Sequence, residues 1–298
     1  MPDNPLAEVF GFPTDNYTAA ATRSRKGKLC PFNNKVPNCT KDKAIDPLGV
    51  CSIFEDNGKA TITCPIRFRE NWMIAEDAAA FFFPSNVAWT SLTEVRLKDA
   101  TGQSAGNIDV VLVSYDSSGR LLDFGSLEIQ AVYISGNVRN PFARYMEDPE
   151  ANATKSWQGI NYPRADYLSS SRKRLAPQML YKGGIFNEWK KKQAVALHKL
   201  FYAKLPELPE LPELPEIAPE NADIAWFLYD LELNEEENRF SLVRHKTIYT
   251  AFEPALLRIT KASAGEIGEF VQILQSTLDE RFSAPDALTL QDLLGGAN

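Results

Sequence analysis

The stretches Asn107-Ile-Asp-Val-Val-Leu-Val-Ser-Tyr115 and Leu127-Glu-Ile-Gln-Ala-Val-Tyr-Ile134 decide the fold of this chain. Both are rich in β-branched and aromatic residues, and Asp116-Ser-Ser-Gly119 between them has the residues of a turn. We therefore predict strands over residues 107–115 and 120–134 that pair as a hairpin. The long apolar runs on both strands indicate that the sheet is buried.

Three polar side chains interrupt these apolar strands: Asp109, Glu128 and Gln130. Side chains alternate along a strand, so Glu128 and Gln130 share one face. An unpaired carboxylate is costly to bury, but acids on neighbouring strands can converge on one hard cation such as Mg²⁺. Such an ion needs an open position for a phosphate oxygen and for the attacking water. The alternative is that this face of the hairpin meets solvent and holds no ion.

The four cysteines of the chain all fall between residues 30 and 64: Cys30, Cys39, Cys51 and Cys64. The N-terminus has no signal-peptide pattern and no segment is apolar enough to span a membrane, so we expect a cytoplasmic protein with reduced thiols. A cysteine cluster in that setting predicts a metal site. Sulfur ligands suit zinc or iron, and the spacing does not separate them. Reduced core cysteines and two disulfides are the alternatives.

Charge is spread unevenly along the chain. The formal net charge of −7 argues weakly against a nucleic-acid-binding protein. However, residues 21–45 and 164–204 are two strongly basic runs, and local basic patches set the affinity for phosphate. The alternative is that both runs are solvated helix faces. The predicted DNA contacts are Arg23, Arg25, Lys26, Lys28, Lys35, Arg172, Lys173 and Arg174.

The remaining segments give a coarse secondary structure. We predict an irregular lead-in over residues 1–22 and little regular structure over residues 23–68. Residues 91–99 are predicted as a strand or a short helix, and residues 164–204 as mostly helical with a break at Gly183-Gly184. Helices are also predicted at Asn71–Phe83 and Glu266–Phe282, and a second hairpin at 224–231 and 240–252.

Four copies of Leu-Pro-Glu at residues 205–216 predict an extended surface insertion, because proline at every third position excludes helix and sheet. We assign residues 1–68 to a basic lobe with a four-cysteine metal site and residues 69–298 to a core that contains this insertion. We find no glycine-rich phosphate loop and no nucleophile elbow, so ATP hydrolysis and serine hydrolase chemistry have no support.

Asp109 followed by Glu128-Ile129-Gln130 resembles the PD-(D/E)xK nuclease motif in the variant with Gln in place of Lys. Together with the four cysteines, it is similar to the NotI-type restriction endonucleases. The similarity extends over roughly residues 25 to 260. It includes the segments Cys30–Asn34, Arg164–Gln178, Tyr181–Gly184 and Ile224–Asp230.

This resemblance implies an α/β fold: a restriction-endonuclease-like mixed β-sheet core flanked by helices, with a small N-terminal four-cysteine lobe. Asp109 and Glu128 would bind a catalytic Mg²⁺, to which the Ile129 carbonyl adds a ligand. Gln130 would orient the attacking water. Glu94 would help to hold metal or water, unless it is a solvated strand residue. Cys30, Cys39, Cys51 and Cys64 would hold a structural iron.

The resemblance also implies the reaction. A homodimer would hydrolyse double-stranded DNA at a GC-rich palindrome and leave 5′-phosphate and 3′-hydroxyl ends, and a DNA methyltransferase would protect the host. Two other functions are consistent with the residues. One is a catalytically silent DNA-binding protein on a nuclease fold, and the other is a repair nuclease that cleaves according to DNA structure.

Overall fold

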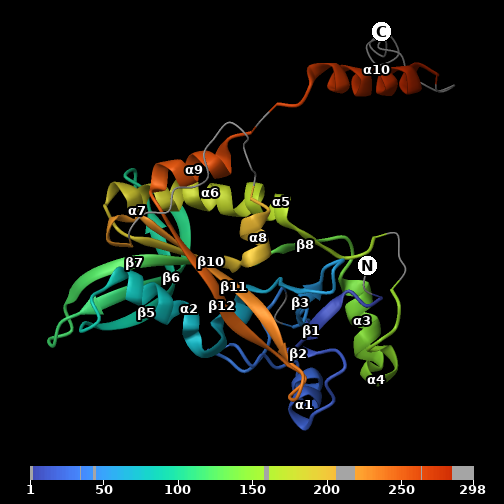
Figure 1. Ribbon diagram of the computed structural model, residues 1–298, viewed down its shortest axis with the longest axis horizontal. Helices are drawn as coiled ribbons and strands as arrows, with labels where there is room; N and C mark the ends of the chain where they lie inside the picture. Colours follow the sequence, from blue (N-terminus) through green and yellow to red (C-terminus); the bar gives the residue numbers. More distant parts are fainter. Residues whose placement is uncertain are drawn as a thin grey trace, which may run out of the picture. The chain divides into compact units, whose positions relative to one another are not determined.

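A mixed sheet of six strands forms the centre of the protein, which we describe from a computed structural model (Figure 1). The strand order is β12-β11-β10-β7-β6-β5. Strand β10 runs parallel to both of its neighbours, and the other pairs are antiparallel. The mixed α/β architecture is therefore confirmed. The strands are β5 (Ala88–Lys98), β6 (Ser104–Tyr115), β7 (Leu121–Gln130), β10 (Gln193–His198), β11 (Ile224–Asn234) and β12 (Arg239–Thr250).

The structure describes residues 3–33, 35–42, 45–157, 161–205, 219–262 and 264–283. The chain divides into two units, Met1–Thr260 and Lys261–Asn298. The Leu-Pro-Glu insertion lies outside the described residues except for Leu205, and the boundary placed after residue 68 stays a prediction. Within the described ranges, no helix combines the length and the apolar character that a membrane crossing requires.

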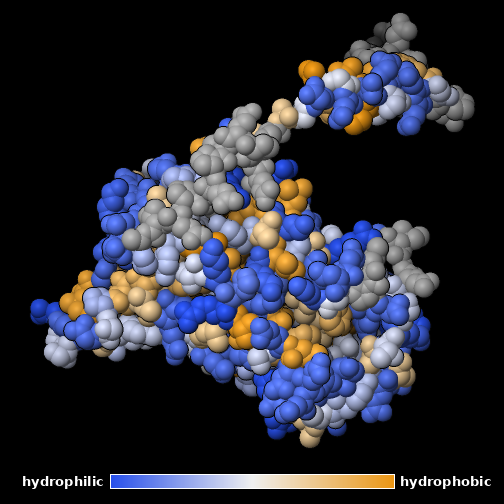
Figure 2. Space-filling view, in the orientation of Figure 1, coloured by the Kyte–Doolittle hydropathy of each residue, from blue (hydrophilic) through white to orange (hydrophobic). Residues whose placement is uncertain are grey.

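The predicted hairpins are confirmed, but the strand predicted over residues 120–134 ends at Gln130, and its last residues belong to the separate strand β8 (Tyr133–Ser135). Strands β6 and β7 are joined by the predicted turn, in which the Gly119 amide donates to the Asp116 carbonyl at 2.9 Å. Strands β11 and β12 form the second hairpin, and residues 91–99 fall mainly in β5 rather than in a helix. At the tip of the first hairpin Leu121 and Leu122 are more than half exposed, and apolar atoms reach the surface of the β5–β7 ribbon (Figure 2).

Helices cover both faces of the sheet. On one face, α2 (Met73–Phe82), the predicted helix, packs Phe81 and Phe82 against Val110, Leu127 and Phe227. On the other face a continuous helical run and α9 (Phe252–Thr260) pack against β10 and β11 (Figure 1). The run comprises α5 (Tyr167–Ser170), η2 (Ser171–Leu175), α6 (Ala176–Gln178), η3 (Met179–Gly183) and α7 (Gly184–Glu188), of which η2 and η3 are π-helical turns.

The prediction for residues 164–204 is partly wrong. The segment starts with β9 (Arg164–Asp166) and ends with α8 (Lys199–Ala203), but its residues 193–198 form the central strand β10. All six residues of β10 are buried between two parallel neighbours, and this tertiary context overrides the helix propensity of Ala and Leu. The predicted break at Gly183-Gly184 is also wrong, because both glycines have helical backbone angles.

The predictions of an irregular lead-in and a weakly structured lobe are wrong as well. The N-terminal residues build a second sheet of four strands in the order β2-β1-β3-β4. Leu6, Val9 and Val50 of this sheet are buried against Phe142 and Tyr145, which no sequence pattern near the N-terminus could reveal. The elements are β1 (Leu6–Val9), β2 (Phe12–Pro13), α1 (Ala19–Gly27), β3 (Val50–Phe54), β4 (Ala60–Ile62) and η1 (Pro65–Trp72).

The remaining elements are short, apart from one. Strand β8 (Tyr133–Ser135) pairs with β9, and Val132 just before it donates its amide to the Ile62 carbonyl, which ties the two larger sheets together. The C-terminal unit contains the predicted helix α10 (Ile267–Ser283). The other helices are α3 (Arg139–Glu147), α4 (Pro149–Asn152) and η4 (Pro219–Asn221).

Candidate active site and cysteine lobe

The three acids predicted for the active site occupy the same register position on three neighbouring strands. Thr93 pairs with Val110 and Val95 with Ile108, so Glu94 of β5 stands opposite Asp109 of β6. The pair Val110–Leu127 likewise sets Asp109 opposite Glu128 of β7. A row of acids across a sheet is the arrangement in which carboxylates can share one cation.

The backbone is irregular at this row. Glu94 has a positive φ of 57°, which non-glycine residues rarely adopt. Ile108 packs with Phe186 whereas Val110 packs with Leu127, so the alternation of the strand is broken at Asp109. Such irregularities redirect side chains and are frequent beside active sites. Here Asp109 turns its Oδ2 toward β7, where it accepts the Ile129 amide at 2.8 Å.

Glu128 is buried, and Asp109 is partly buried. Glu128 is 7% exposed. Burial, followed by the charge of Asp109, raises the pKa of Glu128 to about 7, and the cation of Lys182 opposes this shift. Burial also raises the pKa of Asp109, against the Ile129 amide and Lys182, while the charge of Glu94 raises it further. Two acids with raised pKa values on adjacent strands are typical of a functional site.

Lys182 completes this site and had no role in the sequence prediction. Its Nζ donates to Glu128 Oε2 at 2.7 Å and to the Asn107 carbonyl at 2.8 Å. The signal that could have revealed it is helical spacing, because Met179, Lys182 and Phe186 form one buried helical stripe. A lysine in an apolar stripe requires a partner inside the protein.

The site fits a divalent cation in its donor chemistry. Glu128 Oε1 is buried and has no hydrogen-bond partner, whereas Oε2 is paired with Lys182. An unpaired buried carboxylate oxygen beside a second carboxylate is the kind of ligand that Mg²⁺ takes. Even so, across the residues that the structure describes, no three His, Cys, Asp or Glu side chains converge as a ready metal-binding set. Glu94 shares the row but is exposed at the edge strand.

Gln130 lies on the same strand as Glu128, two residues later. It is 3% exposed, and its Nε2 donates to the Ala131 carbonyl at 2.9 Å. This bond uses one of the two N–H donors of the amide, whose oxygen is an acceptor.

The four cysteines gather around one small enclosed cavity of about 10 Å³ between β3 and the loop that follows α1. All four are free thiols, so the disulfide alternative is wrong. Burial, with smaller contributions from Cys64 and Cys39, raises the pKa of Cys30 to about 11, and burial raises that of Cys51 as well. The thiols are thus close enough to influence one another, yet they do not form a ready metal-binding set either.

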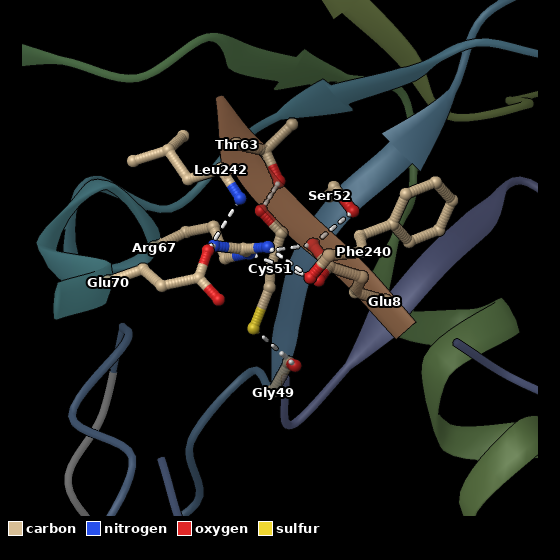
Figure 3. Close-up of polar contacts among 9 residues, drawn as sticks. All are labelled: Glu8, Gly49, Cys51, Ser52, Thr63, Arg67, Glu70, Phe240 and Leu242. Carbon is tan, nitrogen blue, oxygen red and sulfur yellow. Dashed lines mark hydrogen bonds and ion pairs between the residues drawn. The ribbon is translucent and has the colours of Figure 1, made fainter. Parts of the chain in front are cut away.

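A buried charge network joins the cysteine lobe to the large sheet (Figure 3). The Arg67 side chain is fully buried, and its Nε donates to Glu8 Oε1 at 3.0 Å and its Nη1 to Glu70 Oε2 at 2.8 Å. Its Nη2 donates to the Phe240 carbonyl at 3.0 Å, and its Cζ lies 4.2 Å from the ring centre of Phe32. The network therefore connects β1, η1 and β12 with the loop that follows Cys30.

The predicted DNA contacts are placed unequally. Arg23, Lys26 and Lys35 are exposed, and so are Arg172, Lys173 and Arg174 on η2. Lys28 pairs with Asp46 at 3.3 Å on the surface. Arg25 is buried, and its terminal nitrogens donate to the carbonyls of Asn16 and Pro13 at 2.6 Å, so it has no free donor to offer a phosphate from these groups.

A larger cavity of about 690 Å³ lies between the cysteine lobe and the strand β8. Its lining includes Lys41, Cys64, Tyr133, Arg139 and Arg174. Arg174 lies 5.3 Å above the ring centre of Tyr133. The cavity lining thus includes Val132, two residues after Gln130, and cations from both the lobe and the helical run.

These features and one comparison together define the class of the protein: it is a restriction endonuclease, a site-specific deoxyribonuclease. A family model described as restriction endonuclease NotI matches residues 14–242, and the chain belongs to this family. The family implies DNA as substrate and suggests a divalent metal. No curated protein matched the chain.

Proposed function

We propose that this protein is a type II restriction endonuclease that hydrolyses phosphodiester bonds of double-stranded DNA in the presence of Mg²⁺. The observation that carries this proposal is the unpaired, buried Glu128 Oε1 beside Asp109 on the neighbouring strand. The products would be 5′-phosphate and 3′-hydroxyl ends. From the family resemblance we further propose a GC-rich palindromic site cleaved by a homodimer, since two-fold protein symmetry matches a two-fold DNA site.

In this proposal Asp109, Glu128 and the Ile129 carbonyl hold the cation. When bound, Mg²⁺ lowers the pKa of the attacking water and neutralises charge that develops on the phosphate. Gln130 can orient that water through its amide oxygen, because its nitrogen is held by Ala131. Glu94 stands at the same register position and would hold a further water or the cation from the exposed side.

A digestion assay tests the proposal. Plasmid and phage DNA incubated with the protein and Mg²⁺ should give discrete bands, which Glu128→Ala should abolish. Glu188→Ala, a change of an exposed glutamate on α7, is the matched control and should cut normally. Binding without cutting would favour the silent DNA-binding alternative, and cutting only at branched or mismatched DNA would favour a repair nuclease. Sequencing the cut ends gives the recognition sequence and the stagger.

For the DNA interface we propose the exposed cations Arg23, Lys26, Lys28 and Lys35 of the lobe and Arg172, Lys173 and Arg174 of η2. We omit Arg25, because the protein's own carbonyls occupy its terminal nitrogens. The cavity of about 690 Å³ supports a DNA path between lobe and core, since Arg174 and Tyr133 present a cation and an aromatic ring there. Arginine is the common partner of guanine edges.

We propose that Cys30, Cys39, Cys51 and Cys64 bind a structural iron, with zinc as the alternative for this sulfur donor set. The shared cavity and the mutual effect of the thiols on their pKa values support the proposal. Lys41 lies beside them with its Nζ 2.5 Å from the Val50 carbonyl, and its charge lowers the pKa values of Cys39 and Cys51 against the larger effect of burial. The cluster would then stabilise the lobe that holds DNA and would take no part in the reaction.

Elemental analysis of the purified protein tests the cysteine site. Cys39→Ser should lose the bound metal and unfold at lower temperature, because structural metals contribute directly to folding. Asn38→Ser, at the adjacent exposed position, is the control and should keep the metal. A Cys39→Ser protein that retains metal and wild-type stability would contradict the proposal.

The setting of the enzyme follows from the same proposal. A cytoplasmic enzyme of this kind requires a cognate DNA methyltransferase, because the host must protect its own copies of the site. Sedimentation of the protein with and without cognate duplex tests the homodimer: a monomer that stays monomeric on DNA would contradict it.

A further inference from the structure

Lys182 belongs to a helix, yet its side chain ends between the two strands that carry Asp109 and Glu128. Its Nζ contacts Glu128 Oε2 of β7 at 2.7 Å and the Asn107 carbonyl of β6 at 2.8 Å. Side-chain exposure is 9% for Lys182 and for Glu128 alike. A buried ammonium group keeps its charge only beside such acceptors.

The helix is fixed so that Lys182 cannot easily turn away. Lys182 lies in the π-helical turn η3, next to Gly183. A Cβ on Gly183 would lie 3.0 Å from both Gln193 Oε1 and Phe252 Cε2, so a larger residue would force these side chains to shift by a few tenths of an ångström. Gln193 of β10 also donates its Nε2 to the Gly183 carbonyl at 3.0 Å. The turn is therefore anchored to the strand beside β7.

Gln130 cannot supply the positive charge that Lys182 supplies. Gln130 is uncharged and donates its Nε2 to Ala131, although strand alternation sets it on the same face as Glu128. In the described part of the chain, Lys182 makes the one ion pair with either Asp109 or Glu128. Because it takes Oε2, it leaves Oε1 as the unpaired oxygen of Glu128.

We propose that Lys182 is a positioning residue of the nuclease site, whose ammonium group holds Glu128 with Oε1 toward the cation and replaces a charge that position 130 lacks. This inference rests on the proposed function. It differs from a role in folding alone, in which Lys182 would only neutralise a buried carboxylate. At alkaline pH, where Glu128 stays ionised even without Lys182, the two roles predict opposite effects on cation binding. A neutralising cation repels Mg²⁺, so its removal should tighten Mg²⁺ binding, whereas loss of positioning should weaken it.

Four variants test the proposal: Lys182→Met, Lys182→Arg, the double variant Lys182→Met/Gln130→Lys, and the exposed control Lys98→Met on the edge strand β5. Mg²⁺ affinity is measured by calorimetry on the DNA-free protein, and cleavage is measured under single turnover. We expect Lys182→Met to weaken Mg²⁺ binding and to slow cleavage, each by about 10- to 100-fold, as for other partners of metal ligands. Lys182→Arg should lose less, and Lys98→Met should match wild type in both measurements.

The double variant distinguishes a positioned charge from a merely structural one. A lysine at position 130 stands two residues from Glu128 on the same face. It should therefore restore at least part of the Mg²⁺ affinity and of the cleavage rate. If Lys182→Met does not fold, the double variant decides alone: a folded, cutting protein supports the proposal, and a folded protein that neither binds Mg²⁺ nor cuts overturns it. Unchanged or tighter Mg²⁺ binding by folded Lys182→Met also overturns it. Failure of the proposed function would instead appear as wild-type protein that cuts no DNA, and the Mg²⁺ titration is independent of that outcome.

Discussion

Two buried carboxylates in this protein each meet a buried cation, and they differ in what remains unpaired. Glu8 of the N-terminal sheet has both oxygens occupied, by Arg67 Nε at 3.0 and 3.1 Å and by Ser52 Oγ at 2.7 Å. Glu128 of the large sheet has Oε2 occupied by Lys182 and Oε1 without a partner. Both carboxylate oxygens of Glu8 therefore have partners, whereas Glu128 keeps Oε1 for a ligand.

The partners of the two cations show the same difference. Arg67 distributes its donors over Glu8, Glu70 and the Phe240 carbonyl, a set of acceptors that spans three elements (Figure 3). Lys182 is directed at Glu128 and one carbonyl. An unsatisfied buried polar atom is costly, so it persists where function requires it. Under the proposed function, burial of charge serves stability at Arg67 and chemistry at Glu128.

The largest effect on stability is expected at Arg67. Arg67→Met should lower the free energy of unfolding by about 3–5 kcal/mol, because it leaves Glu8 buried without its cation. Urea unfolding with a shared m-value measures this change. Arg23→Met, at an exposed arginine, should stay within about 0.5 kcal/mol of wild type. If Arg67→Met lost no more stability than Arg23→Met, the buried Arg67–Glu8 pair would not serve stability, and the comparison would fail.

A smaller, pH-dependent effect is expected at Glu128. Its pKa in the folded protein is about 7, above the ordinary value of 4.5, so the folded state binds its proton more tightly than the unfolded state does. This stabilisation is present at low pH and is lost as the pH rises through 7. Without added Mg²⁺, wild type should therefore lose about 2–3 kcal/mol relative to Glu128→Gln between pH 4.5 and 7.5.

Thermal and urea unfolding of wild type and Glu128→Gln across this pH range measure the effect. Because Asp109 and Glu128 interact, the difference between the two proteins reports the titration of this pair of acids. If wild type instead lost stability relative to Glu128→Gln as the pH fell, the prediction would be contradicted. With Mg²⁺ present, cleavage by wild type should fall as the pH drops below about 7, since a protonated carboxyl is a poor ligand.

The sequence was sufficient for the parts of the site that lie on one hairpin. Strand alternation and turn residues predict β6, β7 and the acids Asp109 and Glu128, because these signals are local. The central strand β10 was missed, since Gln193–His198 has the composition of a helix and becomes a strand through its two neighbours. The N-terminal sheet was missed for the same kind of reason, because Leu6 and Val9 are buried by residues more than one hundred positions later.

Long-range partners account for the rest. Lys182 is 54 residues from Glu128 in sequence, and Arg67 is 173 residues from Phe240, so no local pattern relates them. The burial of Arg25 is likewise decided by the carbonyls of Pro13 and Asn16, while its sequence context is that of a basic surface. Charge composition predicts where basic residues gather along the chain. It does not tell which of them remain exposed for DNA.

The smallest effect is expected for a single exposed cation on η2, where no buried pair is involved. Lys173→Met should leave stability within about 0.5 kcal/mol of wild type. If Lys173 contacts a DNA phosphate, its loss should reduce the slope of log affinity against log salt by about 0.9 and weaken binding equally for all sequences.

Fluorescence anisotropy with Ca²⁺ in place of Mg²⁺ measures binding without cleavage. Lys98→Met, an exposed lysine on the edge strand β5, is the control for charge alone. Equal slopes for the two variants would place the DNA away from η2, and would leave the lobe cations Arg23, Lys26, Lys28 and Lys35 as the proposed contacts.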